Sequence, residues 1–173
     1  MHFPTPLSST AEQIYLAALS QGYGAKDDSA MVRQYYPEPI AQVSAGKSAE
    51  DNAAALQLVR ELMLGINLCG AAEAVAFARY LGVDMTQFYT LVTDAAGASR
   101  VFNTEGRRMI DGTIGTGRTL DQAVEELEGV VQKARDLNCP LHLGNAALSL
   151  LMLAKRAGHG GEGQWSVVKV FGS

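Results

Sequence analysis

Two glycine-containing motifs have the residue types and spacing that could hold a phosphate. The first, Gly158 to Gly163 (GHGGEG), matches the pattern G-x-G-x-x-G of dinucleotide-binding turns. That turn must leave a strand and open a helix within a βαβ unit. Here the motif follows a predicted helix, and only ten residues remain after it. We therefore interpret it as the turn that ends a helix.

The second motif, residues 41–48 (AQVSAGKS), satisfies the loose phosphate-loop pattern A-x-x-x-x-G-K-S, and a predicted helix follows it. A phosphate loop needs a glycine-rich nest of amides at the end of a buried parallel strand. Pro37 and Pro39 exclude a central strand just before it. We interpret residues 41–48 as linker ending in Ser48, a helix N-cap, and keep nucleoside triphosphate binding there as a weaker alternative.

Arginine side chains form the remaining candidate site. Four of them surround a loop over residues 112–117 that is rich in glycine and threonine: Arg100, Arg107, Arg108 and Arg118. Guanidinium groups bind anions through charged hydrogen bonds, so this cluster is a candidate anion contact. The three histidines and two cysteines show no metal-ligand spacing, and we predict no metal site.

Composition narrows the classes of partner. A net charge of −4 and a pI near 5.3 argue against a nucleic-acid-binding surface. The first residues lack the basic flank and apolar run of a signal peptide. The apolar stretch 62–78 contains Asn67 and Glu73 and is shorter than the roughly 20 residues of a membrane span. We expect a cytoplasmic protein with no membrane or nucleic-acid partner.

The elements that must position these residues are predicted to be helices, so the fold class is all-α. Alanine is abundant, aromatic residues make up 7%, and no two alternating runs flank a tight turn. The longest helix is expected over residues 48–81, with an apolar stripe from Leu56 to Phe77 and a middle, residues 68–72, that is nearly free of large side chains. The first helix follows Pro6, with Ser8, Ser9 or Thr10 as its cap. Shorter helices around the long one are expected over residues 27–35, 85–96, 99–110, 119–137, 140–157 and 162–170.

An internal repeat divides the chain. Residues 3–35 align without gaps onto residues 139–171, an offset of 136, with identities that include Pro4/Pro140, Leu7/Leu143, Gly22/Gly158 and Gly24/Gly160. We therefore expect residues 1–36 to be the terminal helical pair of a preceding unit, residues 37–48 a linker, and residues 49–173 one complete unit. On this interpretation the chain is a piece of a tandem protein.

The complete unit resembles the all-helical C-terminal domain of the β-hydroxyacid dehydrogenases. That family includes the 3-hydroxyisobutyrate, tartronate semialdehyde and L-threonate dehydrogenases, with the 6-phosphogluconate dehydrogenases more distant. The resemblance is carried by Leu64-Gly65-Ile66-Asn67, Leu81-Gly82-Val83-Asp84, Arg108-Met109-Ile110-Asp111-Gly112 and Pro140-Leu141-His142-Leu143. It implies an upstream Rossmann domain that binds NAD(P), and a helical domain that forms much of the dimer interface and one wall of the substrate cleft.

The same resemblance implies that the chemistry has been lost from this copy. The family's general acid/base lysine aligns with Gln57, the asparagine one turn later with Glu61, and a second lysine beside the cofactor with Glu125. A glutamine does not shuttle protons at neutral pH, and the two carboxylates would repel an anionic substrate and the pyrophosphate. We therefore expect no catalytic residue and no cofactor in this chain.

Two roles follow from these observations. The first is a dimerisation and substrate-cleft module of an NAD(P)-dependent hydroxyacid dehydrogenase, not catalytic on its own. The alternative is a stand-alone protein derived from that domain, which binds a small acid or has a regulatory role. Because Ile14, Tyr15, Ala18 and Leu19 of the first helix form an apolar face without its own unit, we expect a homodimer, with helices exchanged between copies as one form.

Overall fold

The computed structural model describes residues 3–35, 48–95, 97–113 and 117–172, and helices dominate them. The described residues hold one strand-like feature, an isolated bridge between Thr119 and Gly163. The expected all-α class is confirmed. The α-helices are α1 (Pro6–Ser20), α2 (Ala49–Tyr80), α3 (Met85–Thr93), α4 (Arg107–Asp111), α5 (Leu120–Asp136) and α6 (His142–Ala154). Two 3₁₀ helices, η1 (Asp28–Gln34) and η4 (Gln164–Phe171), and two π-helical turns, η2 (Phe102–Gly106) and η3 (Lys155–His159), complete the elements.

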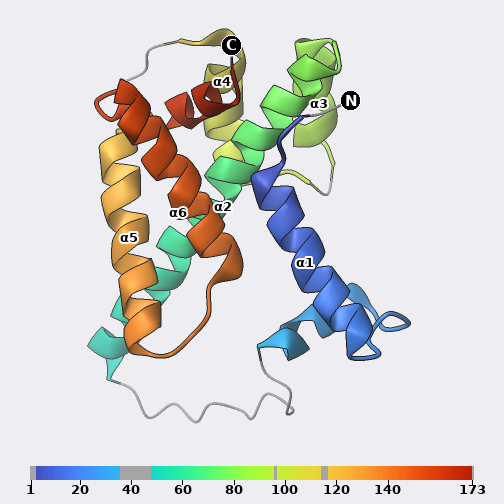
Figure 1. The fold of residues 1–173 in the computed structure, drawn as a ribbon. Coiled ribbons are helices and arrows are strands. Elements are labelled where there is room, and N and C mark those ends of the chain that lie inside the picture. The colour runs from blue at the N-terminus through green and yellow to red at the C-terminus, as the bar shows by residue number, and fades with distance from the viewer. Residues whose placement is uncertain (1–2, 36–47, 96, 114–116, 173) are drawn as a thin grey trace.

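The central element is α2, which agrees with the expected 48–81 helix to within a residue at each end. The hydroxyl of Ser48 caps it by accepting a hydrogen bond from the backbone N–H of Asp51 at 3.0 Å. Helices α5 and α6 and the 3₁₀ helix η4 pack along α2, while α1 lies across α2 and α6 (Figure 1). At 32 residues α2 is about 48 Å long, and it contacts all five other α-helices.

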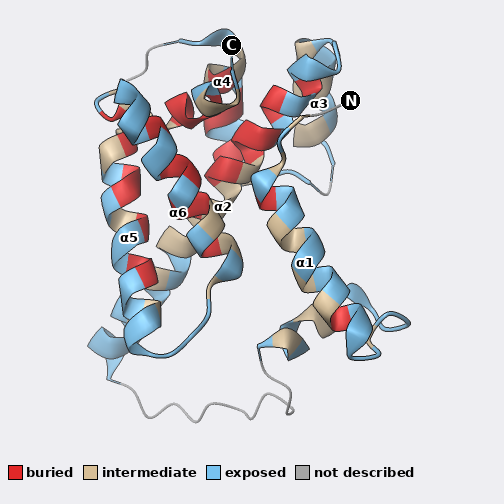
Figure 2. Ribbon diagram, viewed as in Figure 1, coloured by how far each residue is buried: buried red, intermediate tan, exposed pale blue. Residues whose placement is uncertain are grey.

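The packed face of α2 is not the stripe from Leu56 to Phe77. Leu56, Val59 and Met63 are more than half exposed, whereas the core lies on the opposite face, at Leu68, Cys69, Ala71, Ala72, Val75 and Ala76. Figure 2 shows this buried zone in the C-terminal half of α2 and on the facing sides of α5 and α6. Small side chains decide the packed face, because they let α6 approach more closely than large ones would.

At residues 68–72, where large side chains are few, α2 lies close to α6. The Sγ of Cys69 donates a hydrogen bond to the backbone oxygen of Ala147 on α6 at 3.4 Å. Burial raises the pKa of the Cys69 thiol, which therefore stays protonated as a core group. Nearby, a Cβ placed on Gly65 would lie 2.8 Å from a methyl carbon of Leu127 of α5, so this side chain packs directly against the backbone of α2.

The start of α1 differs from the expectation. The hydroxyls of Ser8, Ser9 and Thr10 do not cap it, because the helix already begins at Pro6, whose fixed φ suits the first helical position. The carboxylate of Glu73 on α2 takes the capping role instead. It accepts hydrogen bonds from the backbone N–H groups of Leu7 and Ser8, at 2.8 and 3.0 Å.

The two repeated segments follow the same local path. Helix α1 begins at Pro6 and α6 at His142, and the 3₁₀ helices begin at Asp28 and Gln164, each pair 136 positions apart. The turns between them also agree in backbone angles. Gly22 and Gly158 have φ of +83° and +95°, and Asp27 and Gly163 have φ, ψ of −59°, 150° and −60°, 150°.

By length and composition, the whole of α2 is long and apolar enough to cross a membrane, although its apolar stretch 62–78 is shorter than a span. Half of its most apolar eighteen-residue window is nevertheless buried against the other helices. This burial is what a core helix of a helical bundle requires.

Candidate functional site

Gln57 and Glu61 lie one turn apart on α2, and their side chains bond to each other. The Nε2 of Gln57 donates a hydrogen bond to Oε1 of Glu61. Gln57 is exposed, and Glu61 is half-buried. Helix α2 contains no lysine. An amide bonded to a carboxylate offers neither a cation for a substrate anion nor a proton donor that works near neutral pH.

Glu125, the other position singled out by the sequence, is an exposed residue of α5. Its carboxylate contributes to the field around Lys155. The pKa of Lys155 is raised mainly by its hydrogen bond to Asp121, whose Oδ1 lies 2.9 Å from Nζ, and further by Glu125 and Glu128. This end of α5 is therefore acidic, with one lysine held against it.

The four arginines do not converge on one open site. Arg118 forms an ion pair with Glu126 at 2.5 Å. Arg107 pairs with Asp111 at 3.2 Å and lies over the ring of Tyr89. Each of these guanidinium groups is already matched by a carboxylate, which lowers its value for an external anion.

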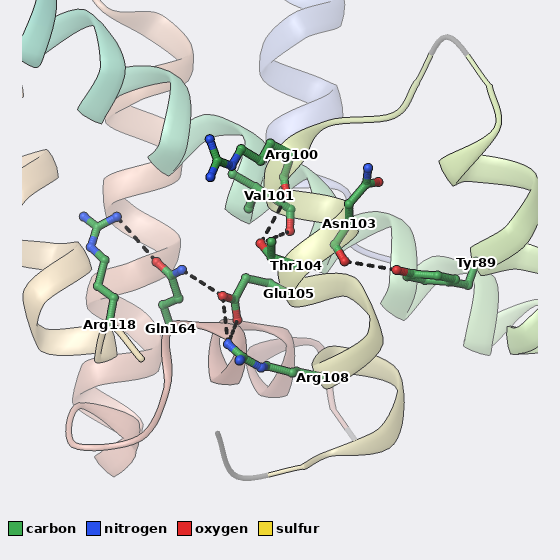
Figure 3. Close-up of polar contacts among 9 residues, drawn as sticks. All are labelled: Tyr89, Arg100, Val101, Asn103, Thr104, Glu105, Arg108, Arg118 and Gln164. Carbon is green, nitrogen blue, oxygen red and sulfur yellow. Dashed lines mark hydrogen bonds and ion pairs between the residues drawn. The ribbon is translucent and has the colours of Figure 1, made fainter. Parts of the chain in front are cut away.

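A polar chain joins two of the arginines through the core of the site (Figure 3). Nη1 of Arg118 donates to Gln164 at 3.4 Å, and Nε2 of Gln164 donates to Oε1 of Glu105 at 3.2 Å. Arg108 pairs with the same Glu105 carboxylate at 3.1 Å. Glu105 is buried, so this network ties η2 and α4 to η4 and is structural in character.

Arg100 is the arginine of the cluster that the network leaves out. It is exposed, and it forms no ion pair with any residue that the structure describes. Its backbone oxygen accepts a hydrogen bond from Thr104. Residues 114–116 of the adjacent loop lie outside the described residues, and the anion contact remains a prediction at Arg100.

The motif over 158–163 is the turn that ends α6, as expected. Gly158 lies inside η3, which continues α6, and its left-handed φ of +95° breaks the helical path. A Cβ on Gly160 would lie 2.5 Å from Oδ1 of Asp121, and one on Gly163 would lie 2.7 Å from the Trp165 ring. The space beside these glycines is filled by the protein's own side chains, an acid among them, so the motif does not fit a dinucleotide phosphate.

Two candidates remain, the second glycine-containing motif and a metal site. Residues 41–47 of the second motif lie outside the described residues, and Ser48 acts as the N-cap of α2. Within the described part of the chain, no group of three His, Cys, Asp or Glu side chains is placed to hold a metal ion.

Sequence reasoning missed three polar residues that organise the structure: Glu73, Glu105 and Gln164. The importance of Glu73 could have been predicted, because it is the one acidic residue in the apolar stretch 62–78 and a buried acid needs a partner. The importance of Glu105 and Gln164 could not, since their hydrogen bond joins positions 59 residues apart.

Comparisons with known proteins identify the family of this chain. Residues 52–171 match the family model described as NAD-binding of NADP-dependent 3-hydroxyisobutyrate dehydrogenase. L-threonate dehydrogenase of Escherichia coli is 31% identical over 138 residues, which cover 77% of this chain and 46% of that protein. The Haemophilus influenzae enzyme of the same name is 33% identical over 118 residues, 68% of this chain and 39% of the relative. The chain spans less than half the length of these relatives.

Solved structures have the same fold. The crystal structure of 3-hydroxyisobutyrate dehydrogenase from Salmonella typhimurium matches with a TM-score of 0.66 and 32% identity, over 68% of this chain and 41% of that one. The Mycobacterium tuberculosis 3-hydroxyisobutyrate dehydrogenase matches with a TM-score of 0.62 over 69% of this chain and 43% of that one. Its 16% identity supports the fold alone.

Proposed function

This chain belongs to the 3-hydroxyisobutyrate dehydrogenase family, and on that premise we propose that it is a helical assembly and substrate-cleft module that performs no catalysis itself. In this proposal residues 49–173 are one complete helical unit, residues 37–48 are a linker, and residues 1–36 are the closing helical pair of a preceding unit. The matching backbone angles of the two repeated segments support this division.

The pair of Gln57 and Glu61 is the observation that carries the non-catalytic role. Where the family implies a lysine and an asparagine, this helix holds an amide that is hydrogen-bonded to a carboxylate. Neither side chain can deliver a proton to a substrate alkoxide at neutral pH, and Glu61 repels a carboxylate substrate. The packing positions around them are kept, and so the unit retains its shape.

The dinucleotide belongs, in this proposal, to a Rossmann domain of the parent protein. The residues described here do not fit NAD(P): Glu125 stands at the position of a cofactor-side lysine, and the glycines of 158–163 are packed against Asp121 and Trp165. The module would contribute one wall beside a cofactor that another domain binds.

Assembly is the second part of the proposed role. Several large apolar side chains on the outer faces of α1 and α2 are about half exposed, among them Tyr15, Leu19 and Met63. Exposed apolar surface of this kind marks an association site. We propose a homodimer of the chain in the cytoplasm, with exchange of α1 between copies as one form of it. A monomer in sedimentation velocity at micromolar concentration contradicts this part.

A turnover assay tests the catalytic part. The purified chain is mixed with L-threonate or 3-hydroxyisobutyrate and with NAD⁺ or NADP⁺, and absorbance at 340 nm is followed. We expect no reduction of either dinucleotide, with or without the double substitution Gln57→Lys and Glu61→Asn, because the proposal places the dinucleotide site in another domain. Reduction by the wild-type chain would overturn the proposal.

A groove beside α2 favours the second candidate, a protein that binds a small acid without catalysis. Among its lining residues are Ile66, Asn67, Val92 and Ser99, which place two polar side chains in an otherwise apolar surface. Calorimetric titration with L-threonate in the absence of dinucleotide tests it. Saturable heat that disappears in Asn67→Leu supports the binding protein over the assembly module.

A further inference from the structure

We propose that the face of α2 around Gly70 and Glu73 is a docking surface for the first turn of the closing helix of a second helical unit, and that α1 is such a helix bound within the same chain. The inference rests on the proposed duplication and adds the place and the chemistry of the contact between units.

The contact is built around a buried charge. Glu73 is only 4% exposed, and within the described part of the chain all of its hydrogen bonds go to α1. One carboxylate oxygen accepts from the backbone N–H of Leu7, and the other accepts from the N–H and the hydroxyl of Ser8. The Leu7 side chain lies 3.5 Å from the position of a Cβ on Gly70, so the missing side chain there makes room for it. A carboxylate that meets the positive end of a helix dipole forms a strong and directional contact.

The exposed fractions of equivalent side chains show that α1 packs on residues 49–173 with a different side than α6 does. Tyr15 of α1 and Leu151 of α6 are equivalent by the offset of 136, yet Tyr15 is 51% exposed and Leu151 is 0% exposed. Val32 and Val168, the equivalent pair in the 3₁₀ helices, are 41% and 4% exposed. The side with which α6 and η4 pack onto their own unit therefore faces outward in α1 and η1. What α1 offers to α2 is its first turn, and so the Glu73 contact joins a closing helix to the long helix of a different unit.

By symmetry, α6 should make the same kind of contact with the long helix of another unit. Two like units associate most often about a two-fold axis, and each contact then occurs twice. The residues of α6 equivalent to Leu7 and Ser8 are Leu143 and Gly144. Leu141 provides no side-chain cap to α6, and no acceptor among the described residues bonds either amide. The partner that fits is the long helix of the preceding unit, with an acidic residue in the register of Glu73 and a small residue three positions before it.

Two labelled peptides test the docking surface on the full chain. One copies residues 3–21, from α1, and the other copies residues 139–157, from α6, with Cys139→Ser. Each is titrated by fluorescence anisotropy into a Leu7→Asp chain, in which α1 no longer fills the site. We expect saturable binding of both peptides, and at least tenfold weaker binding to the wild-type chain, whose own α1 occupies the surface.

The carboxylate is tested in the same assay. Adding Glu73→Gln to the Leu7→Asp chain should weaken both peptides at least tenfold, and a residue 3–21 peptide carrying Leu7→Asp is the matched negative control. Helical circular dichroism and Trp165 fluorescence report whether the variants stay folded. Should Leu7→Asp unfold the chain, Ser8→Pro replaces it, because proline is tolerated in a first turn and removes one of the bonded amides.

Three results overturn the inference: neither peptide binds, only the α1 peptide binds, or binding is unchanged by Glu73→Gln. If only the α1 peptide binds, the surface is specific for α1, and α6 is not equivalent to α1 in this contact. The turnover assay is independent of these peptide measurements. The docking proposal and the non-catalytic role can therefore fail separately.

Discussion

Oε2 of Glu73 on α2 lies 2.8 Å from the backbone nitrogen of Leu7, 66 positions earlier in the chain. This bond makes an acid of the core helix the cap of α1, a role for which the hydroxyls of Ser8 to Thr10 are nearer in sequence. The bond therefore fixes the start of α1 against the core helix.

Replacing that carboxylate should loosen α1 without unfolding the rest. Glu73→Ala leaves the N–H groups of Leu7 and Ser8 without an acceptor, at a cost of about 2 kcal/mol in the free energy of opening α1. Hydrogen-exchange protection of residues 6–20 should therefore fall roughly 30-fold. Glu12→Ala, at an exposed acid of the same helix, is the control. Equal protection in the two variants would show that the bond contributes nothing.

A second substitution should be harmless although its site is fully buried. The Ser166 hydroxyl is 0% exposed, and no described group bonds to it. Its equivalent in the first segment is Ala30. We expect Ser166→Ala to leave the free energy of unfolding unchanged or raise it by up to about 1 kcal/mol, because an unpaired buried hydroxyl is replaced by a methyl group. Urea denaturation measures this. A loss above about 1 kcal/mol would mean that the hydroxyl has a bonded partner.

The helices could be predicted from sequence because their ends are marked locally. Ser48 and Gly82 bound α2, and Gly22 and Gly158 end their helices with positive φ. The packed face of α2 could not be predicted in the same way. Its apolar residues lie all around the helix, and the choice between Leu56 and Leu68 depends on which face α6 can approach most closely.

In the candidate site, too, some contacts could be predicted from local sequence and others could not. The pairing of Gln57 with Glu61 follows from their spacing of one turn on one helix. The pairing of the arginines follows only in part. Arg107 and Arg108 pair at helical spacing with Asp111 and Glu105. Arg118, in contrast, also bonds to Gln164, 46 positions away. After folding, three of the four arginines are paired with carboxylates, and Arg100 has no ion pair among the described residues.

Acid should weaken the junction between α6 and η4. The pKa of Glu162 is lowered, first by its hydrogen bond with Lys169 and then by the one with His159 at 2.9 Å. A carboxyl whose pKa is depressed in the folded state adds stability above its unfolded pKa and loses it as pH falls through the folded value. The urea midpoint of the wild type should therefore drop below about pH 4.5, and in Glu162→Gln the drop should be smaller.

Glu12→Gln, which removes an exposed acid of α1 that forms no ion pair with any described residue, serves as the control for this titration. It should retain the acid-dependent drop of the wild type. Parallel curves for all three proteins would mean that Glu162 contributes nothing to the pH dependence.

Two glycines in helices should respond to alanine in opposite directions. A Cβ on Gly65 of α2 would lie 2.8, 3.1 and 3.3 Å from three carbons of Leu127, a buried side chain of α5 with no room to move aside. We expect Gly65→Ala to lower the free energy of unfolding by about 1 to 3 kcal/mol, as overpacking does. Gly129, in α5, has no atom within 4 Å of its Cβ position, so Gly129→Ala should raise that free energy by up to about 1 kcal/mol through helix propensity. Urea denaturation of the two variants measures both changes. If both stabilise the chain, α2 and α5 do not meet at Gly65 as closely as described.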